Sequence, residues 1–219
     1  MSLIQRKAIS IGRAERDQRD DRFFLVATED SDAPKQYFEA LTLPRIKVLV
    51  LPTLKGSGLS SPTHVVDRLK DAFEQVRRRG QVQPGDEFWV LLDTDRRIQG
   101  SHTRGTTGAL KKASHVDFEV AFSNPSFELW LLLHHVDVVP GTVYSNAENV
   151  EAELKRVLGS YNKTAIGASL YPLSKVPDAI RRARVLEASP DDPVGAWPTK
   201  AGTRIYRLLE RALQGARLG

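Results

Sequence analysis

Short apolar runs alternate with amphipathic segments between residues 22 and 135, and this alternation limits the folds open to the chain. The run 23–28 is continuously apolar, which is typical of a strand covered on both faces. Alternating strands and helices favour a parallel sheet flanked by helices, the Rossmann-like form of the α/β class. The predicted strands are 23–28, 46–51, 88–92 and 116–123, and the predicted helices are 34–43, 62–79, 109–113 and 125–135.

The clearest predicted helix lies between Ser61 and Gly80. Ser61 is a favourable N-cap, Pro62 suits the first turn, and Gly80 suits the residue after the last turn. Apolar residues recur at helical spacing along one face. That face consists of Val65, Val66, Leu69, Phe73 and Val76.

The strand pattern fades beyond Pro140, and three helices are predicted there, over 147–158, 177–187 and 203–213. Loops rich in Pro, Gly and Ser separate them. We therefore expect an α/β core over 22–139 and a helical lobe over 140–219 that packs on it. Residues 1–21 are polar and charged, and they predict a flexible arm.

The composition excludes several classes of site and places few limits on partners. The chain has 219 residues and no cysteine, so it contains neither a disulfide nor a thiolate-bound metal. No apolar run could cross a membrane, and the N-terminus lacks the core of a signal peptide, so we expect a cytoplasmic protein. The net charge is +5, and the basic surplus lies after Glu151. This charge permits a nucleic-acid partner without requiring one.

Carboxylates follow two of the predicted strands. Glu29 comes directly after 23–28, and Asp93 and Asp95 follow 88–92. Side chains alternate along a strand, so Asp93 and Asp95 project to the same side. If the two strands are parallel neighbours, their carboxyl ends share an edge and Glu29 can join the pair. Three such oxygen ligands predict a site for Mg²⁺ or Mn²⁺, as used in chemistry on phosphates.

Glu128 lies inside the apolar predicted helix 125–135, where an ionised carboxylate is costly unless it is paired or bound to metal. One interpretation makes Glu128 a catalytic residue and places it, with Asn124 as a substrate contact, beside Asp93. The other interpretation pairs Glu128 with a buried arginine or a backbone group, so that it only fixes the helix. We interpret His134, at the end of this helix, as structural.

Basic residues beyond the acidic pair are candidates for substrate contact. Arg96 and Arg97 lie in a polar loop that also carries His102. Such a loop can clamp a phosphate or a nucleic-acid backbone, although a simple exposed loop has the same composition. Lys163 is a further candidate. The cluster of Arg181, Arg182 and Arg184 either contacts a partner or faces solvent.

Five segments occur in a fixed order across nearly the whole chain: VATEDSDAPKQYFEAL, FWVLLDTDRR, AFSNPSFELWLLLHH, SYNK and WPTKAGTRIYRLLERAL. Together they resemble the RloB family of prokaryotic phage-defence proteins, and SNPSFELWLLLHH is the most specific of them. The core of that family looks like the topoisomerase-primase (Toprim) fold. The resemblance implies a metal-dependent nuclease or related phosphotransfer enzyme, often working beside an ATPase in abortive infection.

The resemblance also assigns roles to the acidic residues. Glu29 takes the place of the acidic residue after the first Toprim strand, where it would act as a general base or acid. Asp93 and Asp95 take the place of the D-x-D pair that would hold one or two Mg²⁺ ions. Asp30 stands where Toprim proteins usually carry Gly. An acidic residue that many relatives carry nearby is missing, and Asp30 or Asp32 can substitute for it.

Other functions remain open at this point. The chain can be a binding module, in which a Toprim-like core without catalysis serves as the sensor or toxin-holding partner of an ATPase. A glycosyltransferase would use the D-x-D pair with Mn²⁺ and would not need Glu29. A haloacid-dehalogenase-type phosphatase would need D-x-D after the first strand, which here ends in Glu29. The sequence fixes neither the choice between DNA and RNA nor the oligomeric state.

Overall fold

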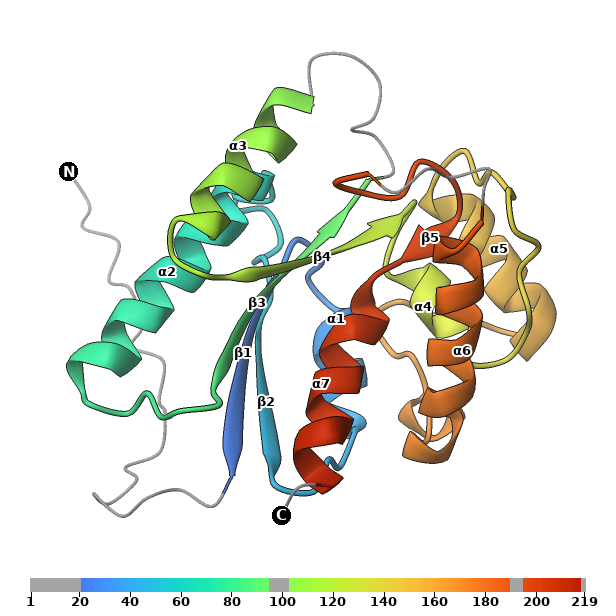
Figure 1. Ribbon diagram of the computed structural model, residues 1–219. Coiled ribbons are helices and arrows are strands. Elements are labelled where there is room, and N and C mark those ends of the chain that lie inside the picture. Colours follow the sequence, from blue (N-terminus) through green and yellow to red (C-terminus); the bar gives the residue numbers. More distant parts are fainter. Residues whose placement is uncertain (1–20, 95–102, 190–194, 218–219) are drawn as a thin grey trace.

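Five strands form one sheet in the order β2-β1-β3-β4-β5 in the computed structural model, which describes residues 21–94, 103–189 and 195–217 (Figure 1). The first four strands are parallel, and β5 is antiparallel to β4. This confirms the predicted α/β class with a parallel sheet. The strands are β1 (Arg22–Thr28), β2 (Ile46–Leu51), β3 (Glu87–Asp93), β4 (Glu119–Asn124) and β5 (Gly202–Thr203).

Helices cover both faces of the sheet. Helices α2 and α3 lie on one face, and α1 and α7 lie on the other, with α4, α5 and α6 beside them (Figure 1). The helices are α1 (Ala33–Ala40), α2 (Pro62–Arg78), α3 (Thr103–Ser114), α4 (Glu128–Leu132), α5 (Ala147–Leu158), α6 (Val176–Glu187) and α7 (Ile205–Arg217). Two short 3₁₀ turns, η2 (Ala168–Leu170) and η3 (Leu173–Lys175), precede α6.

Strand β1 explains why the sheet needs helices on both faces. Phe24 and Val26 belong to the apolar cluster that includes α1 and α7, whereas Phe23 and Leu25 belong to the cluster that includes α2 and α3. Successive side chains of a strand point to opposite faces, so a continuously apolar strand must be covered twice. The expectation that 23–28 is covered on both faces is therefore confirmed.

The observed ends of α2 agree closely with the prediction, and those of α1 agree less closely. Ser61 caps α2, since its Oγ accepts a hydrogen bond from the backbone N–H of His64 at 3.4 Å. Gly80 follows α2 with a φ of +66°, a value that glycine adopts without strain. Helix α1 ends at Ala40, three residues before the predicted end, because the backbone turns extended at Leu41.

The apolar segment 125–135 is only partly α-helical. Helix α4 is confined to Glu128–Leu132, and three-residue turns surround it. The N–H of Leu129 bonds to Ser126 O at 3.1 Å, and the N–H of His135 bonds to Leu132 O at 2.9 Å. The prediction of one helix over the segment was therefore too long. Helix α3 instead begins earlier than predicted, at Thr103.

The C-terminal part completes the sheet as well as covering it. The predicted helices appear as α5, α6 and α7, but the chain first adds β5, which is too short to show a strand pattern. Leu208 and Leu209 share one apolar cluster with Phe24 of β1. The domain boundary at residue 140 stays a prediction. The predicted arm, 1–21, lies outside the described residues except for its last residue.

Candidate active site

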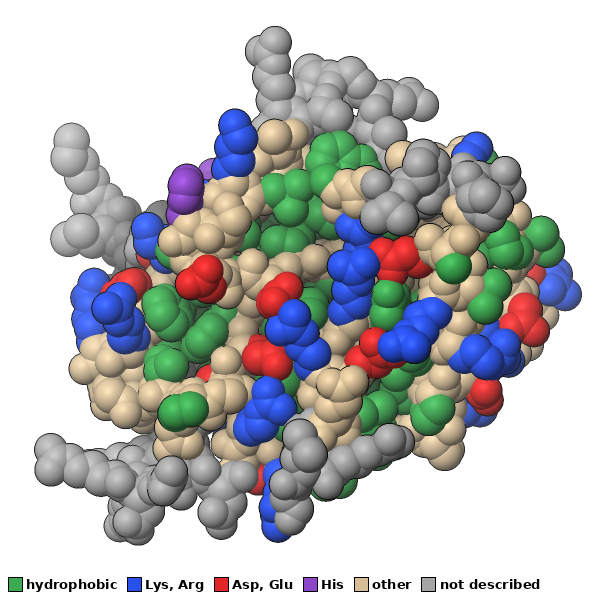
Figure 2. All heavy atoms as spheres, in the orientation of Figure 1, with side chains coloured by type: hydrophobic (Ala, Val, Ile, Leu, Met, Phe, Trp, Pro, Cys, Tyr) green, Lys and Arg blue, Asp and Glu red, His purple; other side chains and the backbone are tan. Residues whose placement is uncertain are grey.

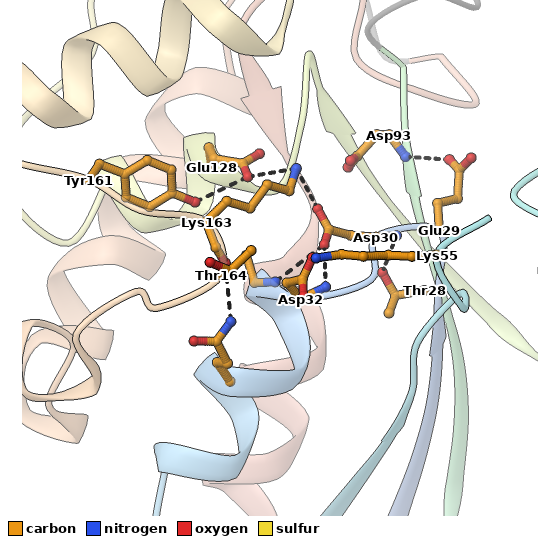
Figure 3. Close-up of polar contacts among 12 residues, drawn as sticks. Thr28, Glu29, Asp30, Asp32, Lys55, Asp93, Glu128, Tyr161, Lys163 and Thr164 are labelled. Carbon is orange, nitrogen blue, oxygen red and sulfur yellow. Dashed lines mark hydrogen bonds and ion pairs between the residues drawn. The ribbon is translucent and has the colours of Figure 1, made fainter.

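The carboxyl ends of β1 and β3 lie side by side because the two strands are parallel neighbours, with Thr28 opposite Leu91. Glu29 follows β1, and Asp93 is the last residue of β3. The backbone N–H of Asp93 donates a hydrogen bond to Glu29 Oε2 at 2.8 Å (Figure 3). Glu29 and Asp93 are therefore neighbours at this edge, but the contact is made by the Asp93 backbone, and the predicted convergence of the two carboxylates on one ion stays a prediction. We call Glu29, Asp30, Asp93 and Glu128 the acidic edge.

The carboxylate of Asp93 faces away from that of Glu29. In Figure 3 it turns towards Lys163 and Glu128, while the Asp93 backbone faces Glu29. Burial raises the pKa of Asp93 well above its ordinary value, and the charges of Glu29, Glu128 and Asp30 raise it further. Negative charge is therefore crowded around Asp93, and a cation would relieve the crowding.

Asp30 links the acidic edge to the start of α1. Its Oδ1 accepts hydrogen bonds from the backbone N–H groups of Asp32 at 2.7 Å and Ala33 at 3.2 Å. Its Oδ2 lies 2.6 Å from Lys163 Nζ, and its side chain is 2% exposed. Asp30 thus accepts hydrogen bonds from the backbone at the start of α1 and also pairs with Lys163, whereas a glycine at this position could do neither.

Glu128 is fully buried and paired. Its Oε1 accepts a hydrogen bond from the Tyr161 hydroxyl at 3.1 Å and lies 3.0 Å from Lys163 Nζ (Figure 3). Its Oε2 is buried without a hydrogen-bond partner in the described part of the chain. The interpretation that Glu128 is paired is therefore supported, but the partner is a lysine that also touches Asp30. Glu128 thereby belongs to the acidic edge.

Hydrogen bonds to the backbone hold the segment around Lys163 in place. Gln36 of α1 donates from Nε2 to Lys163 O at 3.1 Å and accepts from the Ile166 N–H at 3.2 Å. Burial lowers the pKa of the Lys163 ammonium, but the carboxylates of Glu128 and Asp30 outweigh burial and hold this pKa above its ordinary value. Lys163 therefore stays charged. Its predicted role in substrate contact stays a prediction.

Asn124, the last residue of β4, lies at the same edge and contacts the C-terminal part of the chain. Its Nδ2 donates to Pro198 O at 2.9 Å, and the neighbouring hydroxyl of Ser123 lies 2.8 Å from Thr203 Oγ1. On the other side, the Thr94 N–H bonds to Ser123 O at 2.9 Å. These bonds fix the ends of β3, β4 and β5 together.

Arg68 is a neighbour of the site that sequence reasoning missed. Its Nη2 donates to Thr28 O at 2.9 Å and to Thr53 Oγ1 at 2.8 Å. Burial lowers the pKa of Arg68, and the negative charge of Glu29 raises it. The available signal was its position three residues after Val65, on the buried side of an amphipathic helix. Tyr161, which was also missed, stands two residues before Lys163.

Several predicted residues cannot be placed. Asp95, Arg96, Arg97 and His102 lie outside the described residues. Within 21–94, 103–189 and 195–217, no three Asp, Glu or His side chains converge closely enough to form a cation site as they stand. The metal site predicted from Glu29, Asp93 and Asp95 therefore stays a prediction.

His134 is a structural residue, as the sequence suggests. Its Nδ1 lies 2.9 Å from Trp130 O, and its Nε2 lies 3.1 Å from the Tyr37 hydroxyl. Since a carbonyl oxygen can only accept, Nδ1 must carry the proton and Nε2 must accept from Tyr37. Burial lowers the pKa of His134 to about 4, so the ring is neutral at physiological pH.

The basic surplus of the C-terminal part is largely paired with acidic side chains. Arg184 lies 2.7 Å from Glu210, and Arg211 lies 2.7 Å from Glu119. Figure 2 shows blue and red side chains alternating over the region of α6 and α7. The described arginines of this face therefore form no patch of one sign, and a nucleic-acid partner stays a prediction. None of the helices in the described ranges is both long and apolar enough to cross a bilayer.

Comparison with known proteins gives one family. A family model described as RloB-like protein matches residues 24–211, which include all four carboxylates of the acidic edge as well as Lys163. No curated protein and no solved structure matches the chain.

Proposed function

The chain belongs to the RloB-like protein family, and from this premise we propose that it is a metal-dependent enzyme with a Toprim-type core that hydrolyses phosphodiester bonds. Its substrate is a nucleic acid, RNA or DNA, and its setting is prokaryotic defence against phage beside a partner ATPase. The observation that carries the proposal is the acidic edge, where Asp93 is crowded by three further carboxylates.

The donor atoms of the acidic edge suit a hard divalent cation. Carboxylate oxygens are the ligands that Mg²⁺ and Mn²⁺ prefer, and the crowding that raises the pKa of Asp93 is relieved when a cation binds. In this proposal Glu29, Asp93 and Asp95 would hold the cation, which requires the Asp93 carboxylate to turn from the side of Lys163 towards Glu29. When bound, such a cation would polarise a phosphoryl oxygen and stabilise the attacking and leaving oxygens.

The side chains of the chain divide the remaining work. Glu29 accepts a proton from the attacking water or from a ribose hydroxyl, with its carboxylate oriented by the Asp93 N–H. Asp93, whose pKa is raised, carries a proton more readily than an ordinary aspartate and releases it when the cation binds. Asn124 lies near the scissile phosphate, and Arg96 and Arg97 contact the substrate backbone.

Incubation with labelled RNA, tRNA, single-stranded DNA and duplex DNA tests the proposal. We expect cleavage with Mg²⁺ or Mn²⁺ that EDTA abolishes and that Asp93→Asn reduces at least a hundredfold. Asp67→Asn is the matched control, because Asp67 pairs with Lys112 on the surface of α2 and should leave cleavage unchanged. Equal cleavage by wild type and Asp93→Asn, or no cleavage of any substrate with either metal, would contradict the proposal.

One observation favours a second function, that of a binding or sensor subunit of an ATPase defence complex. Lys163 already neutralises charge on Asp30 and Glu128, so part of the acidic edge is balanced without a metal. In that case the protein binds a partner ATPase, with Asp93→Asn leaving the binding intact, and cleaves none of the four substrates. Co-purification with the ATPase encoded beside it separates the two functions.

A further inference from the structure

Arg68 of α2 holds the carboxyl end of β1. Its Nη2 donates hydrogen bonds to Thr28 O at 2.9 Å and to Thr53 Oγ1 at 2.8 Å. The Thr53 hydroxyl in turn donates to Thr28 O at 3.0 Å. Thr28 is the last residue of β1, so two donors from other segments fix the carbonyl group directly before Glu29.

The backbone on the other side of Glu29 is fixed as well. The Thr53 N–H donates to Asp30 O at 3.3 Å, and the Asp30 N–H donates to Thr28 Oγ1 at 3.2 Å. The N–H of Glu29 itself donates to Leu91 O of β3 at 3.4 Å. The peptide groups beside Glu29 therefore have little freedom, and its side chain starts from a defined position.

Packing alone does not explain an arginine at this position of α2. Its neighbours on the buried face of the helix, Val65, Leu69 and Ala72, are apolar. Arg68 Nε is buried without a hydrogen-bond partner in the ranges that the structure describes. A buried donor without an acceptor costs free energy, so stability alone would favour an apolar side chain. Burial lowers the pKa of Arg68 and the charge of Glu29 raises it, so the two charged groups stabilise each other.

The Asp93 N–H reports where the Glu29 carboxylate lies. Glu29 Oε2 accepts from this N–H at 2.8 Å, and Figure 3 shows the Glu29 side chain extending from the end of β1 to the Asp93 backbone. If the backbone of Glu29 shifts, this hydrogen bond lengthens or breaks. An N–H without its acceptor exchanges its hydrogen with water faster.

We propose that Arg68 is a positioning residue that acts through the end of β1 to keep the Glu29 carboxylate on the Asp93 N–H. Without Arg68, Thr28 O keeps one donor of two, and the peptide before Glu29 is free to turn. The effect on cleavage rests on the proposed function, in which Glu29 accepts a proton. The effect on the hydrogen bond does not.

Three variants separate this role from the loss of any arginine. Arg68→Met keeps a long, helix-forming side chain without donors or charge. Arg68→Lys restores both, and because Nη2 makes both bonds to the β1 end, one ammonium group can replace it. Arg77→Met is the matched control, because Arg77 lies on the same helix, pairs with Glu74 at 3.5 Å and is 66% exposed in its side chain.

The test is amide hydrogen exchange of the full chain in EDTA, followed by NMR. The N–H of Asp93 is compared with those of Trp89 and Val90 in the same strand. We expect Arg68→Met to speed exchange at Asp93 at least tenfold and to leave Trp89 and Val90 unchanged. Arg68→Lys should recover most of the protection, and Arg77→Met should match wild type. Unchanged exchange at Asp93 in Arg68→Met, or equal acceleration at all three positions, would overturn the inference.

Cleavage gives a second readout. A misplaced proton acceptor slows the chemical step more than it weakens substrate binding. Arg68→Met should therefore lower kcat at least tenfold with KM within threefold of wild type, and Arg68→Lys should recover kcat. Faster exchange at Asp93 in a protein that cleaves nothing would contradict the proposed function alone. Cleavage that needs Asp93, with exchange at Asp93 unchanged in Arg68→Met, would overturn this inference alone.

A second variant decides the question if Arg68→Met does not fold. Thr53→Val keeps the shape of the side chain and the N–H bond to Asp30 O. It removes one donor to Thr28 O and one acceptor of Arg68. We expect exchange at Asp93 to rise at least threefold, and an unchanged rate would overturn the inference.

Discussion

The backbone N–H of Asp93 donates to Glu29 Oε2 at 2.8 Å, so a side chain joins the ends of β1 and β3 beyond their last backbone bonds. The same hydrogen bond orients the Glu29 carboxylate towards the end of β3, where Asp93 lies. The two residues that the sequence singles out are thus coupled in stability as well as in charge. Two substitutions of Glu29 separate the effect of its hydrogen bond on stability from the effect of its charge on cation affinity.

Glu29→Gln should leave the fold stable and lower the affinity for divalent cations. Glutamine still presents an oxygen to the Asp93 N–H, whereas Glu29→Ala leaves this partly buried N–H without its acceptor and should cost about 1–3 kcal/mol. Urea unfolding of both variants in EDTA measures the difference. Equal loss of stability in Gln and Ala variants would show that the hydrogen bond does not hold the strand ends.

Asp93 should contribute a loss of stability to the metal-free protein as the pH rises. The pKa of Asp93 is raised in the folded state above the ordinary value of 3.8, so between these two pKa values the folded state binds more protons than the unfolded state. Stability from this group is present below pH 3.8 and is lost as the pH rises through the folded pKa. Thermal melts of wild type and Asp93→Asn in EDTA from pH 4 to 8 test this. The variant should lack this component of the slope, and parallel curves for the two proteins would argue against the raised pKa.

His134 should contribute a pH dependence of the opposite sign. Its pKa is lowered to about 4 in the folded state, against 6.5 in the unfolded chain. The unfolded state therefore binds the proton first, and stability falls as the pH drops from 6.5 towards 4. Two-dimensional NMR of the ring nitrogens should find His134 neutral down to about pH 4.5, with the proton on Nδ1. A midpoint near 6.5 would contradict the buried Tyr37–His134 contact.

Arg204→Ala should release the segment that precedes β5. The Arg204 guanidinium bonds to Glu187 at 2.9 Å and to the carbonyl oxygens of Ala196 at 2.6 Å and Gly195 at 2.7 Å. Glu187 keeps Tyr206 and Arg207 as partners, so the loss comes from the hydrogen bonds of the charged guanidinium, which contribute about 1.5–3 kcal/mol each. Urea unfolding should show a loss of this size, and limited proteolysis should cut between 195 and 203 in the variant first. Wild-type stability in Arg204→Ala would show that the segment is held by other contacts.

The sheet and the adjacent positions of Glu29 and Asp93 at its carboxyl edge could be predicted because both follow from local pattern. Strand β1 contains the continuous apolar run 23–27, α2 has both end signals, and parallel strands bring their carboxyl ends to one edge. Strand β5 could not be predicted, since two residues carry no period. The length of α4 was overestimated, because apolar residues occur in 3₁₀ turns as well as in α-helices and the sequence does not distinguish the two.

The pairing of Glu128 with Lys163 depends on tertiary structure. The two residues come from α4 and from the turns after α5, and only packing of these elements against α1 brings them together. The sequence showed that a buried Glu128 needs a partner, but it could not select Lys163 among the basic residues. The same holds for Arg68, whose role depends on the ends of β1 and β2 lying under α2.

Anomalous diffraction from crystals soaked in Mn²⁺ tests the central claim most directly. The account predicts an anomalous peak in coordination contact with the Asp93 carboxylate at the carboxyl edge of the sheet, absent from Asp93→Asn crystals soaked in the same way. Crystals with bound Mn²⁺ elsewhere and none at Asp93, or with no bound Mn²⁺ at all, would contradict it.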